Sequence, residues 1–163
     1  MNQALQGTSG VEGWAGMAGQ MPQPALRTDA VSVVYTTVDD TLEAARVGAE
    51  LANALGVPLR LIHFRTVPPQ VSVDALGGVS PLETKDFIRR LRTLGIAARV
   101  RVYLCRDETS TIGFAFREHS IVVIGGRRSW LPTRAERWRH ALEAAGHFVM
   151  FVDPSEHKER SHA

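Results

Sequence analysis

Short apolar runs alternate with segments of helical periodicity along most of this chain. Five runs, at 31–38, 59–67, 99–105, 121–124 and 148–152, have the β-branched and aromatic character of strands. The four segments between them repeat apolar residues every three or four positions, as helices do. Right-handed crossovers between parallel strands place helices on both faces of a sheet. The alternation therefore predicts an α/β fold with a doubly wound, five-stranded parallel sheet and helices on both faces.

Capping residues and glycines mark where these helices begin and end. Asp39, Asp40 and Thr41 are the predicted capping residues of the first helix, which Gly56 stops. The segment 80–83 (SPLE) has the cap, proline and glutamate of a second helix start. A third, short helix is predicted over 107–119, and Thr133 with Glu136 forms a capping box for the last one.

The chain of 163 residues divides into one domain and two tails. Residues 1–27 are rich in Gly, Gln, Met and Ala and predict a disordered N-terminal tail. Residues 28–153 form the predicted domain, and the polar residues 154–163 predict a flexible C-terminal tail.

Composition narrows the functional classes. The formal charge is only +2, from 19 Lys and Arg against 17 Asp and Glu, so nucleic acid is not an expected partner. The single cysteine, Cys105, excludes an intrachain disulfide and a cysteine metal cage, and it favours a cytoplasmic location. No apolar run approaches the roughly 20 residues of a membrane-spanning helix, so membrane insertion is not expected.

Ligands of doubly wound sheets bind at the carboxyl ends of the strands, where the strand order reverses. The segments that follow the first and fourth strands are therefore the candidate nucleotide or anion site. Its candidate residues are Thr36, Thr37, Gly125, Gly126, Arg127 and Arg128.

Those same segments carry a family resemblance. Residues 33–55 (VVYTTVDDTLEAARVGAELANAL) resemble the first strand and helix of universal stress proteins, and 112–129 (IGFAFREHSIVVIGGRRS) look like their fourth strand and glycine turn. The resemblance covers about 31–153. The resemblance implies a sheet with strand order 3-2-1-4-5. The wider adenine nucleotide alpha hydrolase-like group shares this fold.

Members of this family that bind ATP carry an aspartate ending strand one and, after strand four, G-x-x-G, nine residues and G-[ST]. Here Thr36 replaces the aspartate, Gly125 matches the first glycine and Arg128 replaces the second. Trp138 and Arg139 fall where G-[ST] is required. Side chains at these positions occupy space that phosphates need, so tight ATP binding is not expected and no cofactor is predicted.

Two other kinds of site remain open. Arginines at 127, 128, 134, 137 and 139 are either a side-chain anion site or a solvated helix face paired with Glu136 and Glu143. His63 and Cys105 lie on neighbouring predicted strands, but no third residue orients such a pair. No metal-ligand spacing and no catalytic motif occurs, so an enzyme of the wider superfamily is disfavoured.

The fifth predicted strand is an apolar sheet edge. It contains Phe148, Val149, Met150, Phe151 and Val152. An uncovered edge of this kind invites a second strand, and members of the similar family pair in this way. We therefore expect a homodimer and a non-enzymatic regulatory or partner-binding role. The alternative is a nucleotide or phosphate-metabolite binder that uses the arginine-rich loop after strand four.

Overall fold

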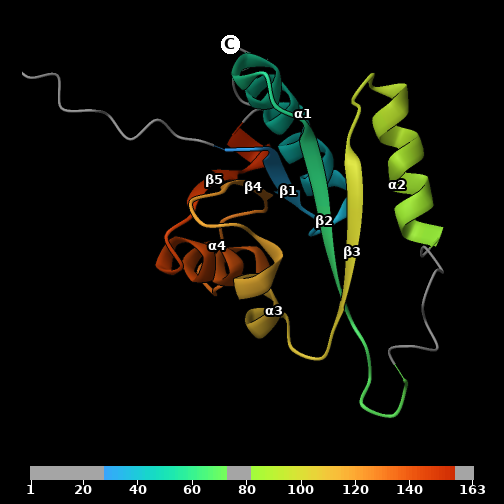
Figure 1. The fold of residues 1–163 in the computed structure, drawn as a ribbon, viewed down its shortest axis with the longest axis vertical. Coiled ribbons are helices and arrows are strands. Elements are labelled where there is room, and N and C mark those ends of the chain that lie inside the picture. The colour runs from blue at the N-terminus through green and yellow to red at the C-terminus, as the bar shows by residue number, and fades with distance from the viewer. Residues whose placement is uncertain (1–27, 73–81, 157–163) are drawn as a thin grey trace, which may run out of the picture.

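The computed structural model describes residues 28–72 and 82–156 (Figure 1). The predicted N-terminal tail therefore lies outside the described residues, as do Ser80 and Pro81 of the predicted second helix start. Of the predicted C-terminal tail, 154–156 are described and form a helical turn after Asp153.

Strands and helices alternate along the described chain. In order they are β1 (Val31–Val34), α1 (Val38–Leu55), β2 (Leu59–Thr66), α2 (Leu82–Thr93), β3 (Arg99–Cys105), α3 (Glu108–Ala115), β4 (Ile121–Gly125), α4 (Arg134–Ala144) and β5 (Phe148–Val152). All strand pairs are parallel and the sheet order is β3-β2-β1-β4-β5. The predicted doubly wound α/β fold and its strand order are confirmed.

Two apolar layers sandwich the sheet. One lies against α1 and α2 and includes Val33, Ala45 and Phe87. The other lies against α3 and α4 and includes Phe64 and Trp138. Figure 1 shows α3 and α4 together on one side of the sheet and α2 on the other.

Two predicted helix boundaries are wrong. Helix α1 is capped by Thr37, whose hydroxyl accepts the Asp40 N–H, so the strand before it ends at Val34 and Asp39 lies in the first helical turn. Helix α3 ends at Ala115, well before His119, which adopts a left-handed φ of 54°.

The predicted capping box at the start of α4 is confirmed. Thr133 and Glu136 exchange hydrogen bonds there, with the Thr133 N–H donating to the Glu136 carboxylate at 2.8 Å. Leu94 and Ala145 are both exposed. Both lie just beyond the last helical residue, where the chain turns away from the sheet.

The sheet has two edges of different character. The β3 edge carries the exposed Arg99 and Arg101, whereas β5 exposes Phe148 and Met150. Within the described residues, no helix combines the length and apolar character that crossing a bilayer demands.

Candidate functional site

The ends of β1 and β4 meet at the switch point of the sheet, as predicted. The Thr36 hydroxyl donates to the carbonyl oxygen of Gly125 at 2.8 Å, and the Thr36 N–H donates to the Thr41 hydroxyl at 3.0 Å. The neighbouring Thr37 is exposed, but its hydroxyl is engaged at the helix cap with Asp40. The structure therefore brings Thr36 and Gly125 together and ties both segments with internal hydrogen bonds.

Close packing explains why positions 125 and 126 are glycines. A Cβ at Gly125 would lie 1.9 Å from the carbonyl oxygen of Asp40, because the first turn of α1 crosses directly over the end of β4. A Cβ at Gly126 would lie 2.6 Å from the Ala135 Cβ and 3.1 Å from the Phe151 ring. Both glycines let other parts of the protein approach the backbone, a use that requires no phosphate.

The loop after β4 already holds an anion of the protein itself. The Arg128 N–H donates to a carboxylate oxygen of Asp153 at 3.1 Å. The other oxygen accepts from the Ser155 N–H at 2.9 Å and from the Ser155 hydroxyl at 2.5 Å. Burial of this carboxyl acts to raise its pKa, but the hydrogen bonds from Ser155 and Arg128 outweigh burial and lower it. Asp153, which directly follows β5, is therefore an ionised internal ligand of the loop.

Trp138 belongs to the core. Only 3% of its surface is exposed, and its ring meets the Phe64 ring edge-on with centroids 5.6 Å apart. The guanidinium of Arg134 lies 4.4 Å from the Trp138 ring centroid and forms an ion pair with Glu108. The residue at the position of the family's glycine thus fills the space beneath α4.

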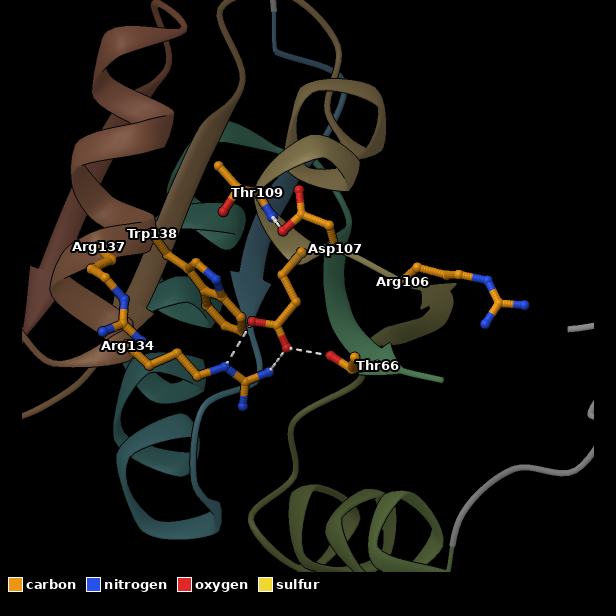
Figure 2. A pocket seen from close by; sticks show the side chains of 8 residues that line it. Thr66, Arg106, Asp107, Thr109, Arg134, Arg137 and Trp138 are labelled. Atoms are coloured by element: carbon orange, nitrogen blue, oxygen red, sulfur yellow. Dashed lines mark hydrogen bonds and ion pairs between the residues drawn. The ribbon is translucent and has the colours of Figure 1, made fainter. Parts of the chain in front are cut away.

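A pocket of about 300 Å³ opens beside this ion pair (Figure 2). Figure 2 shows Arg134 directed at a carboxylate that also accepts a hydrogen bond from the Thr66 hydroxyl. The two oxygens of that hydrogen bond are 3.0 Å apart. That carboxylate belongs to Glu108, which sequence reasoning missed because 26 residues separate it from Arg134. Arg106 extends away and donates to the carbonyl oxygen of Pro68 at 2.8 Å. The charge of Arg134 in this pocket is neutralised by Glu108. Their ion pair joins α3 to α4.

The predicted arginine cluster does not converge on one point. Arg139 pairs with Glu143 at 3.8 Å, as the solvated-face interpretation predicts. The Glu136 carboxylate is held in the capping box, and the hydrogen bond from the Thr133 N–H, together with the charge of the nearby Arg139, lowers its pKa. Within the described residues Glu136 interacts with Arg139 through charge but forms no direct ion pair. The other members of this arginine cluster that are exposed and form no ion pair with a described residue are Arg127, Arg128 and Arg137.

His63 and Cys105 lie on opposite faces of the sheet. The His63 ring packs on Tyr35 and lies 3.2 Å from the Thr84 hydroxyl of α2, whereas Cys105 is buried in the layer under α3 and α4. Burial also raises the pKa of the Cys105 thiol. The two side chains therefore form no pair. Among residues 28–72 and 82–156, no group of three His, Cys, Asp or Glu is placed to hold a metal ion.

The β5 edge is exposed as predicted. Phe148 is 51% and Met150 42% exposed, and with Leu51 and Ile121 they line an apolar surface pocket of about 270 Å³. Phe148 donates its N–H to the carbonyl oxygen of Ser120. Because backbone direction alternates along a strand, the N–H groups that face outward belong to the residues at 149 and 151.

Comparison with known proteins identifies the architecture. No protein-family model matches the sequence, and no curated protein matches it significantly. A universal stress protein from Archaeoglobus fulgidus aligns with a TM-score of 0.55 and 19% identity over 76% of this chain and 92% of its own. A protein of the universal stress protein family from Burkholderia pseudomallei aligns with a TM-score of 0.52 and 19% identity over 78% and 97%.

A third structure, the universal stress protein from Archaeoglobus fulgidus in complex with dAMP, aligns with a TM-score of 0.53 and 18% identity over 76% of this chain and 96% of its own. All three alignments span nearly the whole of the solved proteins and most of the described domain. The chain therefore has the fold of the universal stress proteins.

Proposed function

We propose that this protein is a non-enzymatic, cytoplasmic regulatory protein that works by association, first with a second copy of itself through the β5 edge, and that it does not bind ATP tightly. The observation that carries this proposal is the exposed apolar edge at Phe148 and Met150. An uncovered edge presents unpaired N–H and C=O groups, and natural proteins cover such edges.

The contrast between the two sheet edges supports self-association through β5. Strand β3 exposes Arg99 and Arg101, whose like charges oppose pairing with a second β3. Strand β5 carries no charged residue. Antiparallel pairing of two β5 strands around a two-fold axis joins the outward N–H and C=O groups and covers Phe148 and Met150 in the same step.

The switch point supports the second part of the proposal. A protein with the same fold was solved in complex with dAMP. In this chain the Arg128 N–H is engaged by Asp153, Gly125 is closed by α1, and Trp138 lies in the core. To bind there, a nucleotide phosphate would have to displace the ionised Asp153 carboxylate from the hydrogen bond that it accepts from the Arg128 N–H. Binding is therefore weaker than it would be at a loop whose N–H groups are free.

Light scattering on the full chain at micromolar concentration tests self-association. We expect twice the 17.9 kDa mass of a single chain. Val149→Pro removes an outward donor and leaves the β4–β5 hydrogen bonds intact, and Met150→Lys brings two cations together across the two-fold axis. Both variants are expected to be folded monomers.

Val102→Lys is the matched control. Val102 is also an exposed apolar residue, but on the β3 edge, so the dimer should survive this change. A monomeric mass for the wild type refutes the proposal. A dimer that survives both β5 substitutions but not Val102→Lys places the interface at the wrong edge and refutes it equally.

A further inference from the structure

A polar patch interrupts the sheet face beneath α3, at the end of the strands opposite the switch point. Ser32 of β1 is in register with Arg60 of β2, which is in register with Arg99 of β3. Helix α3 has only 8 residues, and its buried Ile112 packs in the apolar layer nearer the carboxyl ends. The end of α3 and the residues that follow it, 114–117, lie over the amino ends of the strands on this face and leave a pocket there.

This pocket has a volume of about 230 Å³. Its polar lining consists of Ser32, Arg60, Arg101, Tyr103, Arg117 and Ser120. Phe114 stands at its rim with 87% of its surface exposed. The pocket thus combines three guanidinium groups, hydroxyl groups and one exposed aromatic ring.

Positive charge in this pocket exceeds the negative charge that faces it. Asp29 bridges Arg60 at 3.0 Å and Arg117 at 3.1 Å. Although burial acts to raise the pKa of this carboxyl, the two arginines lower it, so Asp29 is ionised. Arg101 has no ion pair with any described carboxylate. One carboxylate against three guanidinium groups leaves a surplus of two positive charges.

The Ser32 hydroxyl lines the floor of the pocket and has no hydrogen-bond partner within the described residues. Ser32 is 4% exposed, and within the described residues its side chain makes no hydrogen bond. Ser120, by contrast, donates its hydroxyl to the carbonyl oxygen of Arg117 at 2.6 Å. A hydroxyl that opens into a pocket and has no protein partner can donate to a bound anion, and a hydrogen bond to a charged group strengthens binding. The hydroxyl of Ser32 therefore points to a ligand with hydrogen-bond acceptors.

We propose that this pocket binds the phosphate group of a small ligand, either free phosphate or a phosphomonoester. Guanidinium groups match phosphate oxygens in charge and geometry, and Arg101 and Ser32 supply a free cation and a free donor. The pocket lies at the amino ends of the strands, on the side opposite Thr36 and Gly125, so its occupation is independent of the switch point.

Isothermal titration calorimetry of the full chain at constant ionic strength tests this proposal, with inorganic phosphate and phenyl phosphate as the two probes. Saturable binding is expected. Tighter binding of phenyl phosphate indicates an ester ligand that contacts Phe114, and equal binding indicates free phosphate. Arg101→Gln and Ser32→Ala should each weaken binding about tenfold, since each removes a bond to a charged group.

Two controls make the test specific. Arg99→Gln removes a cation from the same strand and face but outside the pocket lining, so binding should change by less than about twofold, as expected for a screened charge. Ser32→Ala should leave the melting temperature of the unliganded protein unchanged or raise it, because its hydroxyl bonds nothing there. Absence of saturable binding by both probes, or equal losses in the Arg99 and Arg101 variants, overturns the proposal.

Discussion

Replacement of Gly125 by alanine tests the seating of α1 on the sheet. The added Cβ would lie 1.9 Å from the carbonyl oxygen and 2.5 Å from the carbonyl carbon of Asp40, and 3.2 Å from the Ala44 Cβ. The first two atoms belong to backbone, so no side-chain rotation relieves the clash and α1 has to shift. Overpacking costs typically 1–3 kcal/mol, and a backbone clash belongs at the upper end, about 3 kcal/mol. In a domain of this size that corresponds to a fall in Tm of roughly 6–12 °C.

Urea unfolding followed by circular dichroism measures this loss, and Gly113→Ala is the matched control. A Cβ at Gly113 meets nothing within 4 Å, and the residue lies in α3. Alanine is favoured over glycine in helices by about 0.5–1 kcal/mol, so this variant should be slightly more stable than the wild type. If Gly125→Ala is as stable as the wild type, the contact between α1 and β4 does not explain this glycine.

Three further substitutions probe the loop, the core and the histidines. Asp153→Ala leaves the Arg128 N–H unpaired and should cost about 1–3 kcal/mol in urea unfolding, and no loss would contradict the internal-ligand assignment. Trp138→Ala should cost about 3–5 kcal/mol in the same assay, whereas a surface residue would cost under ~1 kcal/mol. Burial and His119 lower the pKa of His147 below 6.5, so its contribution to stability is present above pH 6.5 and is lost as the pH falls through the folded-state pKa. His147→Asn should flatten this acid dependence in unfolding titrations, and an unchanged dependence would exclude His147 as its source.

The local features of this fold are readable in the sequence because they depend on neighbouring residues. Alternating periodicity predicts the five strands, and the spacing of Thr133 and Glu136 predicts the cap that the structure shows. The boundary errors are local too. The hydroxyl of Thr37 caps α1, and the predicted capping residues Asp39, Asp40 and Thr41 lie inside the helix.

The features that decide function depend on contacts between distant residues. Asp153 and Arg128 are 25 positions apart in the sequence and come together because β5 lies beside β4. The spacing of residues within one segment cannot predict such a contact. The row formed by Ser32 and Arg60 likewise exists only through the register of β1 with β2. Sequence periodicity gives the face on which a strand residue lies, but the register gives its neighbours.

Calorimetric titration of the full chain with ATP and with dAMP tests the central claim most directly. A ligand present at 100 times its Kd stabilises its protein by ~2.7 kcal/mol, so tight binding is also visible as a rise in melting temperature. Repeating both titrations with Arg101→Gln separates the switch point from the pocket beneath α3. We expect no saturable heat at micromolar nucleotide from either protein. Micromolar binding of ATP that persists in the Arg101→Gln variant would show that the loop at Arg128 accepts phosphates after all, and would contradict the account.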